Sequence, residues 1–410
     1  MSAGLCLADV DKEADVMIAN LSADQLAGLD LQCACGRRHR VPIDHIITGA
    51  GALERLPEAV AAYAGCRTLL VSDSHIWPLA GERVKGLLER AGLTVETYVF
   101  SRREHYVTDE AAIGELLVRL PQDAGLIVAL GSGTMNDISR VVSARCRLPY
   151  IVVGTAPSMD GYASSTSAVI CAGEKLSVPL CAPRGIVIDT DLLITAPDEM
   201  LSAGIGDVLG KHVTLADWRL AAREGRDHFC GEISDLIEAA CRRCQAGVYG
   251  VLERRPEALK DMSDTLIMAG AAISMFGTSR PCAGSEHQLA HAWEMDGLRA
   301  GRSGLHGNYV GLGTVAAILL YCEAADEVDL PGLGYVLPEP EAIREIMDRA
   351  GGWATKERLG VDRESFLKAF VHSARTNPRY TILTWLDEHG CLRDCAHRVT
   401  GIIYGQRFTV

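Results

Sequence analysis

Three histidines in the second half of the chain are the first residues whose type and spacing suggest chemistry. The sequence GSEHQLAHAWEM places His287 and His291 four residues apart, and LHGNYVGLG adds His306 after a glycine-rich turn. Residues four apart in an α-helix lie on one face, so the first two imidazoles are expected to share the same space. Neutral imidazole is a good ligand for zinc, nickel or ferrous iron. The alternative is that these histidines are ordinary core or surface residues with their own hydrogen-bond partners, or that they pair with Glu286 or Glu294.

Asp207 is the candidate for an oxygen ligand at the same site. A catalytic metal site usually combines imidazole with an oxygen ligand and leaves one coordination position open. Asp207, in the sequence GIGDVLGKH, stands alone as an acid in a glycine-rich helical segment, and Lys211 lies one turn further along the same face. The residue types therefore predict a metal site shared between two helical segments.

A glycine turn in the first half is a candidate for dinucleotide binding. The segment LIVALGSGTMNDISRVV has the pattern of a strand, a turn and a helix. Gly131 and Gly133 would let the backbone approach a diphosphate, and the following helix N-terminus would stabilise its negative charge. The segment departs from the GxGxxG pattern because Asn136 takes the place of the third glycine. An ordinary strand-to-helix turn is the alternative.

Polar residues also follow two neighbouring apolar runs. Asp73, in LLVSDSHIW, would either accept hydrogen bonds from an adenosine ribose or cap the next helix. Thr155, Ser158 and Ser164, in GTAPSMDGYASSTSAV, supply small hydrogen-bonding groups after another run. Ligands of open parallel sheets collect at the carboxyl ends of the strands, so these residues are expected to line one binding edge.

Two different kinds of structure must position these residues. The first half contains the apolar runs CRTLLVSD, LTVETYVF, AGLIVALGSG, LPYIVVGTAPS and GIVIDTDLL, separated by helical stretches. Such runs predict a parallel, Rossmann-like sheet covered on both faces. From about residue 195 onward the pattern is helical. We therefore predict an α/β dinucleotide-binding domain over residues 1–194 and an all-α metal- and substrate-binding domain over residues 195–410, with the small-molecule site in the cleft between them.

Three local features accompany this division. The sequence TAPDEM predicts a helix start in which Thr195 is the cap and acids occupy the first turn. Residues 172–183 are expected to form a hairpin over the cleft. The most apolar run, YVGLGTVAAILLYCEAA, is short and interrupted by glycine, so it predicts a buried helix and no membrane insertion.

Composition and charge exclude several classes of protein. The chain has 410 residues and a formal net charge of -13, with no block of lysine and arginine, which excludes a general nucleic-acid binder. The N-terminus lacks the basic region of a secretory signal. Most of the 14 cysteines stand singly in apolar stretches, a pattern typical of reduced thiols in a cytoplasmic protein.

Three groups of cysteines are exceptions and raise the question of a further zinc site. They lack the paired CxxC spacing of a strong zinc motif, so reduced thiols are the preferred interpretation of each. The groups are Cys33, Cys35 and His39 in CACGRRH, Cys241 and Cys244 in CRRC, and Cys391, Cys395 and His397 in CLRDCAH.

Five motifs in order resemble those of a known family. GSGTMND, TAPSMDGYASS, GIGDVLGK, GSEHQLAH and LHGNYVGLGT are similar to motifs of the sn-glycerol-1-phosphate dehydrogenases, within the iron-containing alcohol dehydrogenase and dehydroquinate synthase superfamily. The resemblance covers residues 40–400 and is closest to the bacterial branch encoded in arabinose operons. It implies a dehydroquinate synthase-like fold and a homodimer. CACGRRH also resembles the entry segment of that branch, which counts against zinc there.

The resemblance assigns a role to each matching residue. It implies that one divalent metal, zinc, nickel or iron, is held by Asp207, His287 and His306, and that Asp207 and His291 are catalytic. It implies substrate contacts from Asp160, Asp207 and His291. It implies that NAD or NADP is bound by Asp73, Gly133, Thr134, Met135, Asn136, Asp137, Thr155, Ala156, Pro157, Ser158 and Ser164. The loop before His306 is longer than in archaeal members, so the rim of the pocket departs from theirs.

The implied reaction is the NAD(P)-linked interconversion of dihydroxyacetone phosphate and sn-glycerol 1-phosphate. Three alternatives are a metal-dependent dehydrogenase of an unphosphorylated polyol such as glycerol, a dehydroquinate synthase-like lyase, and a dinucleotide sensor without activity. A phosphorylated substrate needs a cation near the metal, and Lys211 and Arg302 are the candidates. For Lys211 the alternative is an intrahelical pair with Asp207. Asp73 predicts that NADH is used at least as well as NADPH.

Overall fold

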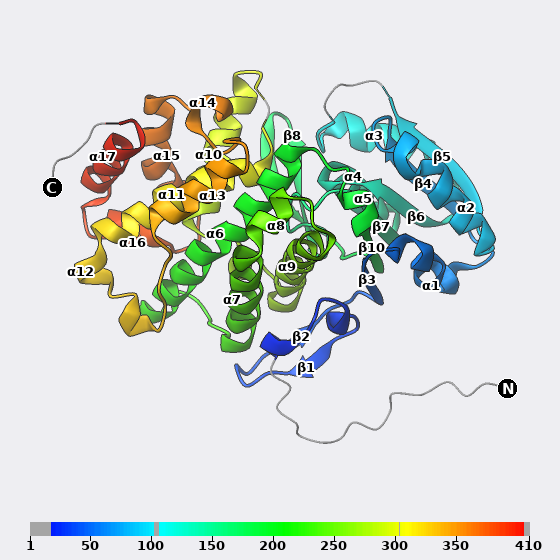
Figure 1. Cartoon of the computed structure of the whole chain (residues 1–410), viewed down its shortest axis with the longest axis horizontal. Coiled ribbons are helices and arrows are strands. Elements are labelled where there is room, and N and C mark those ends of the chain that lie inside the picture. The colour runs from blue at the N-terminus through cyan, green and yellow to red at the C-terminus, as the bar shows by residue number, and fades with distance from the viewer. Residues whose placement is uncertain (1–17, 102–105, 303, 406–410) are drawn as a thin grey trace.

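A six-stranded sheet and an array of helices lie side by side in the computed structural model (Figure 1). The structure describes residues 18–101, 106–302 and 304–405. The start of the chain, where the sequence predicts no secretory signal, lies outside the described residues. The predicted fold class, an α/β half followed by a helical half, is confirmed.

The large sheet is parallel throughout, in the order β3-β10-β7-β6-β4-β5. All five apolar runs identified in the sequence form strands of this sheet, and the sequence analysis missed only the short edge strand β3. The strands are β3 (His45–Gly49), β4 (Arg67–Asp73), β5 (Thr94–Phe100), β6 (Ala124–Gly131), β7 (Tyr150–Gly154) and β10 (Gly185–Asp189).

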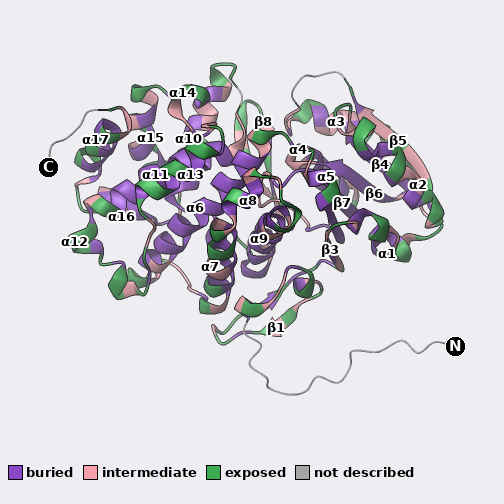
Figure 2. Cartoon of the chain, viewed as in Figure 1, coloured by how far each residue is buried: buried purple, intermediate pink, exposed green. Residues whose placement is uncertain are grey.

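Alternate residues of each strand pack on opposite faces of the sheet, as the period of two requires. Leu70 and Val128 pack in one core cluster with α1 and α2, whereas Leu69 and Val71 pack in a second cluster with α3 and α4. Because helices cover both faces, the four inner strands, β4, β6, β7 and β10, are buried almost throughout, whereas the edge strand β5 is mostly half-buried or exposed (Figure 2). These helices are α1 (Leu56–Val60), α2 (Glu82–Arg90), α3 (Glu110–Arg119), α4 (Gly133–Cys146) and α5 (Thr190–Leu193).

The strand order reverses between β4 and β6. From β4 the chain moves outward to β5, and from β6 it moves to the other side through β7 and β10. Ligands of doubly wound sheets bind outside the carboxyl ends of the strands at such a reversal. β4 ends at Asp73 and β6 ends at Gly131, so the two predicted nucleotide-contacting segments meet at this point.

The helical half begins at α6, a long and almost fully buried helix (Figure 1). The predicted helix start is confirmed, but the predicted cap is wrong. Pro197 is the N-cap residue and Thr195 instead donates to the carbonyl of Leu192. The helices are α6 (Asp198–Arg223), α7 (Gly231–Ala246), α8 (Val248–Leu252), α9 (Pro256–Phe276), α10 (Ser285–Arg299), α11 (His306–Glu323), α12 (Ala325–Val328), α13 (Pro340–Arg349), α14 (Lys356–Leu359), α15 (Arg363–Thr376), α16 (Ile382–Glu388) and α17 (Leu392–Ile403).

The most apolar run forms the core helix α11, as predicted, with nearly every residue buried. No single helix within the described residues is long and apolar enough to cross a membrane. The pair His306–Glu323 and Ala325–Leu333 meets the criteria of length and composition only when taken together, and it is bent by 74°.

Two antiparallel hairpins lie outside the large sheet. The predicted hairpin is confirmed as β8 (Thr166–Cys171) paired with β9 (Glu174–Pro179), so it begins earlier than expected. The other hairpin, β1 (Asp30–Gln32) with β2 (Arg38–Arg40), lies below α7 and α9 in Figure 1, away from the α/β half. The division of the chain at residue 194 stays a prediction.

Glycines let α6 and α11 cross at unusually short range. A Cβ on Gly206 would lie 2.1 Å from the carbonyl oxygen of Gly307, and a Cβ on Gly307 would lie 1.8 Å from that of Ala203. Neither carbonyl can move without breaking its helix. The contact therefore admits no side chain. It places Asp207, which follows Gly206, and His306, which precedes Gly307, at the same crossing.

We expect Gly307→Ala to lower the free energy of unfolding by about 3 kcal/mol, because the methyl group would force the two helices apart. Denaturant titration of the purified protein measures this. Gly114→Ala is the matched control, because Gly114 lies in a helix and a Cβ added there would have no atom within 4 Å, so alanine should be neutral or slightly stabilising. Equal stability of Gly307→Ala and the wild type would contradict the steric argument.

Candidate active site

The structure brings the three histidines together at the start of two helices. His287 and His291 lie one turn apart on α10, with ring centroids 6.3 Å apart. His306 is the first residue of α11, and its ring centroid is 5.2 Å from each of the other two. The chain after the glycine-rich turn therefore brings His306 back to the first two histidines.

Asp207 adds a buried carboxylate to this group. Its Oδ1 lies 3.5 Å from Nε2 of His287, and its Oδ2 accepts from the backbone N–H of Asp160 at 2.8 Å. Ligand atoms of Asp160, Asp207 and His287 all lie within 4.8 Å of one another. The α/β half thus supplies a carboxylate, Asp160, directly beside the carboxylate and imidazole of the helical half.

Two glutamates hold the histidine rings in orientation. Oε1 of Glu286 lies 2.7 Å from Nδ1 of His287, and Oε1 of Glu294 lies 2.9 Å from Nδ1 of His306. A carboxylate accepts, so each Nδ1 carries a proton, and in the neutral form of each ring Nε2 keeps its lone pair. Carboxylates behind ligating histidines orient the rings and raise their basicity.

The donor set fits a divalent metal. Two imidazoles with free Nε2 atoms and one buried carboxylate match the ligands of zinc, nickel and iron centres. The sequence analysis considered ion pairs with glutamate as an alternative to a metal site. In the structure these pairs use only Nδ1 of His287 and His306, so Nε2 of each ring can still bind a metal. Asp207, His287 and His306 are thus the residues that would hold the ion, and this assignment stays a proposal.

Lys211 is buried beside Asp207 and is fully engaged. Its Nζ donates to Oδ1 of Asp207 and Oδ2 of Asp160, both at 2.7 Å, and to the carbonyl of Cys282 at 3.1 Å. Burial opposes the charge of Lys211, but the two carboxylates raise its pKa well above the ordinary value. Burial likewise opposes the charge of Asp207, and Lys211 and His287 outweigh it and lower the pKa of Asp207. All three donors of Lys211 are used, so it has none left for a phosphate.

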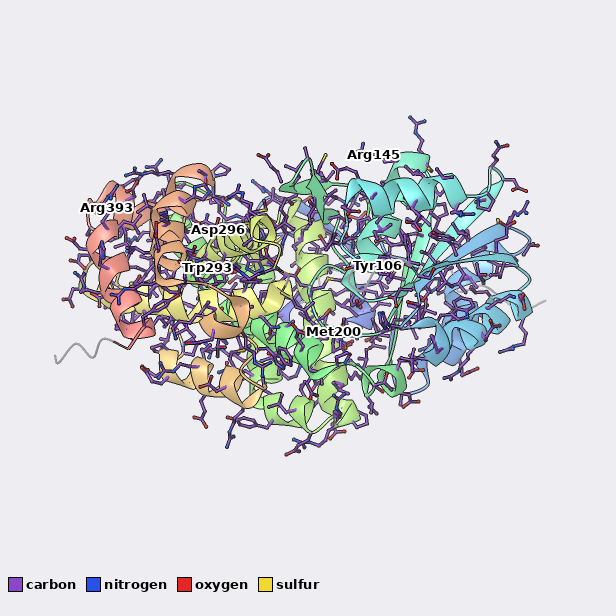
Figure 3. All side chains as sticks on the ribbon, turned by 90° about the horizontal axis from the view of Figure 1, so that it is seen from above. Tyr106, Arg145, Met200, Trp293, Asp296 and Arg393 are labelled. Carbon is purple, nitrogen blue, oxygen red and sulfur yellow. The ribbon has the colours of Figure 1, made fainter. Side chains whose placement is uncertain are left out.

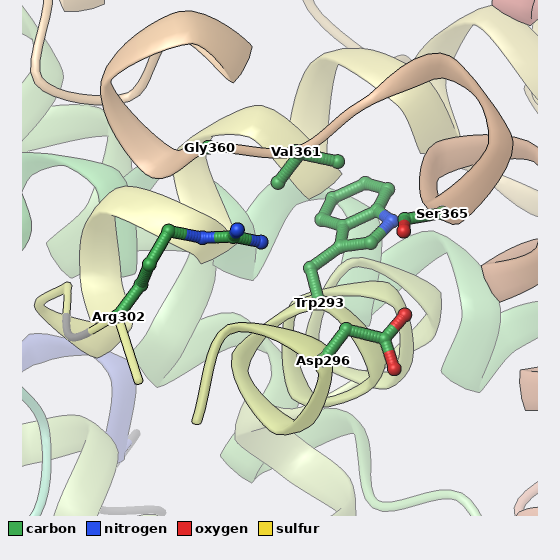
Figure 4. A pocket seen from close by; sticks show the side chains of 6 residues that line it. All are labelled: Trp293, Asp296, Arg302, Gly360, Val361 and Ser365. Carbon is green, nitrogen blue, oxygen red and sulfur yellow. The ribbon is translucent and has the colours of Figure 1, made fainter. Parts of the chain in front are cut away.

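Arg302 also fails to reach the site in this structure. Nε of Arg302 would lie only 2.7 Å from a Cβ added at Gly360, and the guanidinium of Arg302 points toward Trp293 (Figure 4). Seen from above, Trp293 and Asp296 of α10 lie within the helical half and Tyr106 lies in the α/β half (Figure 3). Arg302 is therefore exposed on the helical half and directed toward Trp293, and the hypothesis that it covers the substrate gains no support.

Lys175 is a cation at the site that the sequence analysis missed. It lies on β9, and its Nζ forms an ion pair with Oε2 of Glu294 at 2.6 Å, so the hairpin reaches from the α/β half to α10. Its charge also acts on Asp137 and on His291. The pKa of His291 lies well below its ordinary value, first because the protein around the ring reduces its solvation and second because the Lys175 ammonium repels a positive charge there. No local motif marks this lysine, because only the hairpin geometry brings it here.

His291 keeps contact with solvent. It lines one end of a groove of about 810 Å³ between α10, α15 and α17. The predicted catalytic residue is thus placed between the other two histidines and water.

The carboxylate of Asp73 caps the following turn with one oxygen and leaves the other oxygen for the ribose contact, which stays a prediction. Its Oδ1 accepts from the backbone N–H groups of His75 at 2.8 Å and Ile76 at 3.1 Å, so it caps the turn after β4. Its Oδ2 faces the neighbouring strand, 3.9 Å from the position of a Cβ on Gly131. One oxygen therefore remains directed to the point where the strand order reverses.

The first turn of α4 and the loop after β7 fit a dinucleotide. Ser132, the N-cap of α4, makes no capping hydrogen bond, so the first N–H groups of this helix are available to an anion. Oγ1 of Thr155 is buried without a partner among the described residues. These features meet at the carboxyl edge of the sheet and suit a diphosphate and its neighbouring polar groups.

Other residues assigned to the cofactor have structural partners of their own. Oδ1 of Asp137 accepts from Arg140 at 2.7 Å and from Ser167 at 3.1 Å, which ties α4 to β8. Oγ of Ser164 accepts from the backbone N–H of Thr166 at 3.0 Å. The remaining assigned residues lie along the same edge: Gly133 and Thr134 open α4, the buried Met135 and Asn136 follow, and Ala156, Pro157 and Ser158 form the loop after β7.

Comparison with known proteins agrees with this combination of sheet, helices and site. Residues 47–197 match the family model of the iron-containing alcohol dehydrogenases. A sulfoacetaldehyde reductase from Bifidobacterium kashiwanohense, solved in complex with NAD+, shares the fold with a TM-score of 0.65 and 18% identity over 88% of this chain and 98% of its own. The fold and the family-model match thus place the chain among the iron-containing alcohol dehydrogenase-like proteins.

Closer relatives narrow the class. The glycerol-1-phosphate dehydrogenase (NAD(P)+) of Bacillus licheniformis is 31% identical over 88% of this chain and 93% of its own. The enzyme of the same name from Geobacillus stearothermophilus is 29% identical over 90% of this chain and 98% of its own. The chain belongs to the glycerol-1-phosphate dehydrogenase family.

We expect His287→Ala to carry one metal ion per chain fewer than the wild type and to lose activity while keeping its fold. Glu286→Gln should weaken the affinity for this ion about 10- to 100-fold, because the amide holds the ring less firmly. Metal analysis and circular dichroism of the purified variants measure both effects. His397→Ala, an exposed histidine on α17, is the control and should change neither. Full metal content with normal turnover in His287→Ala would disprove the assignment.

Proposed function

We propose that this chain interconverts dihydroxyacetone phosphate and sn-glycerol 1-phosphate with NAD(P) and one divalent metal. The observation that carries the proposal is the meeting of Asp207 and His287 with Asp160 of the α/β half, beside the ring of His306, whose centroid is 5.2 Å from that of His287, in a chain of this family. When bound, the metal would supply a Lewis acid for the substrate oxygen, and the dinucleotide would supply or take up the hydride.

The protein's own groups prepare this chemistry in two ways. Glu286 and Glu294 keep Nε2 of His287 and His306 free to bind. Lys211 holds the carboxylate of Asp207 in its charged form and fixes its direction. A site whose dipoles and charges are fixed before the reaction needs little reorganisation as charge develops on the substrate.

Reduction of the ketone also needs one proton at the oxygen that becomes the hydroxyl. His291 is adjacent to His287 and His306 and keeps contact with solvent, so its ring can pass a proton from water to that oxygen. Asp160 lies close enough to the site to accept a hydrogen bond from a substrate hydroxyl.

Lys175 is the cation that we assign to the substrate phosphate. Lys211 has three acceptors, whereas Lys175 pairs with Glu294 alone within the described residues and lies on a hairpin that bridges the two halves. An ammonium there would bind a dianion with a charge-assisted hydrogen bond. This assignment replaces Lys211 and Arg302, the two candidates drawn from the sequence.

The alternative functions are less well supported. A polyol dehydrogenase would share the metal ligands but would not need the ammonium of Lys175. A dehydroquinate synthase-like lyase would need several more basic groups, whereas Lys211 and Arg280 are buried and bound to protein acceptors. A sensor would have no need of oriented metal ligands.

Two further predictions remain proposals. The described cysteines are free thiols, which supports a reducing compartment such as the cytoplasm. The homodimer implied by the family resemblance rests on that resemblance alone.

We expect the wild type to use dihydroxyacetone phosphate far more efficiently than dihydroxyacetone. Lys175→Ala should reduce kcat/KM for the phosphorylated substrate about 10-fold or more, the equivalent of about 1.5 to 3 kcal/mol, and leave the other substrate nearly unchanged. Arg302→Ala is the control, because it removes the same charge, and it should keep the preference for dihydroxyacetone phosphate over dihydroxyacetone. Equal use of both substrates by the wild type would favour the polyol dehydrogenase instead.

We also expect NADH to be used at least as well as NADPH, because Oδ2 of Asp73 would repel a 2′-phosphate. Asp73→Asn removes the charge but keeps an acceptor for the N–H groups of His75 and Ile76, so it should shift the preference toward NADPH without loss of stability. Asp73→Gly removes both and should also destabilise the turn. Steady-state kinetics with each cofactor measure the shift, and a strong wild-type preference for NADPH would show that Asp73 only caps the turn.

A further inference from the structure

Four potential metal ligands meet at a second place, far from the histidines of the active site. Cys33 and Cys35 lie in the turn of the N-terminal hairpin, His39 lies on β2, and Cys230 comes directly before α7. Their ligand atoms all lie within 4.8 Å of one another. Only the first three belong to one sequence motif, and the fold supplies the fourth.

The spacing of these atoms matches a tetrahedron around an ion. The sulfurs of Cys33 and Cys230 are 3.7 Å apart, and Nε2 of His39 lies 3.3 Å from the sulfurs of both Cys35 and Cys230. With Zn–S bonds of about 2.3 Å and a Zn–N bond of about 2.0 Å, tetrahedral geometry gives about 3.8 Å between two sulfurs and about 3.5 Å between sulfur and nitrogen. The observed distances are close to these edges.

His39 presents the correct nitrogen to the cluster. Its Nδ1 lies 3.1 Å from the backbone carbonyl of Met275 on α9, and a carbonyl can only accept, so Nδ1 carries the proton. In this tautomer Nε2 keeps its lone pair, and it faces the sulfurs of Cys35 and Cys230. A backbone carbonyl behind a ligating histidine fixes the ring in this way at metal sites.

The hairpin turn has a backbone suited to two ligands. The N–H of Cys33 donates to the carbonyl of Arg37, and the N–H of Gly36 donates to the carbonyl of Cys33. Gly36 has a φ of +87°, which a side chain would strain. The N–H of Cys35 also points to the sulfur of Cys33 at 3.5 Å. Cys33 and Cys35 are thus held on the same side of a tight turn before any ion binds.

Cys230 is held by the helix that follows. It is the N-cap residue of α7, where the partial positive charge of the helix favours a thiolate. Cys33, His39 and Cys230 are buried, and Cys35 is partly exposed.

The other cysteine groups in the sequence do not assemble in this way. Cys241 and Cys244 are both buried on α7, and Cys391, Cys395 and His397 lie at the start of α17. Neither group brings three ligand atoms together within the part of the chain that the structure describes.

We propose that Cys33, Cys35, His39 and Cys230 bind one structural zinc ion that fastens the N-terminal hairpin to the start of α7. Three thiolates and one imidazole are soft ligands in the closed tetrahedral set typical of structural zinc. Binding releases the three thiol protons to solvent and leaves a site with one net negative charge. The four ligands leave no position for a substrate, so the ion has no part in turnover.

The ion would supply stability that the hairpin itself lacks. β1 and β2 have three residues each, and an isolated two-stranded hairpin is marginally stable at best. The ligands join positions 197 residues apart in the chain. The resemblance of CACGRRH to a family entry segment, which seemed to speak against zinc, is compatible with this role.

The test is to count zinc in the full chain, purified without chelator, and in variants of each site. We expect Cys230→Ser and Cys35→Ser each to carry one zinc ion per chain fewer than the wild type. Cys244→Ser is the matched control, a buried cysteine on the same helix, and should lose none. His287→Ala should keep this zinc, which separates the hairpin site from the proposed catalytic metal.

Cobalt(II) gives a second readout that does not depend on activity. Chain reconstituted with cobalt should show a thiolate-to-cobalt charge-transfer band in the wild type, Cys244→Ser and His287→Ala, and should lack it in Cys35→Ser. Cys35 is partly exposed, so its substitution disturbs folding least if Cys230→Ser is insoluble. In the wild type, iodoacetamide should modify Cys33, Cys35 and Cys230 only after a chelator is added.

Three results would overturn the proposal. These are equal zinc content in the wild type and Cys35→Ser, the absence of a charge-transfer band in cobalt-loaded wild type, and a disulfide between Cys33 and Cys230 in freshly purified protein.

Discussion

The close crossing of α6 with its neighbours is the constraint on which the site depends. Three glycines on α6 meet three different parts of the molecule: a Cβ on Gly204 would lie 1.8 Å from the carbonyl of Pro157, one on Gly206 2.1 Å from that of Gly307, and one on Gly210 3.3 Å from the side chain of Glu286. One helix therefore touches the loop after β7, the start of α11 and the carboxylate behind His287. Side chains at these positions would push the two halves apart and would also move the proposed ligands away from one another.

Burial of so many charges beside that crossing has an energetic cost. Moving charged groups from water into protein is unfavourable unless each is paired and hydrogen-bonded, and apolar side chains of similar size often give equal stability. Here Lys211 is matched by the carboxylates of Asp160 and Asp207, and Glu286 is matched by His287 and Thr214. Such a network contributes little to stability alone. Its value lies in holding oxygen and nitrogen atoms in fixed directions, which a metal site requires.

Sequence reasoning succeeded where local spacing determines the answer. The strands were predicted because each is a buried apolar run, and His287 and His291 were placed on one face by their separation of one turn. It missed β3, whose five residues alternate less clearly, and Thr195 was misassigned because the proline after it supplies the helix start. Lys175 and the orientation of Glu294 could not be predicted, since both depend on how a hairpin from one half meets a helix of the other.

The same limit explains the four-ligand cluster at the hairpin. Cys33, Cys35 and His39 form only part of a tetrahedral set, and the missing ligand lies 191 residues beyond His39, in a stretch with no partner cysteine nearby. The structure also connects this cluster to the active-site loop through α9. The backbone carbonyl of Met275, near the end of α9, accepts a hydrogen bond from His39. Gly270, earlier on the same helix, packs so closely against the active-site loop that a Cβ there would lie 2.5 Å from the carbonyl oxygen of Asp160. The hairpin and the loop that carries Asp160 therefore rest on the same short stretch of one helix, so an ion that fixes the hairpin also limits how far this stretch can move.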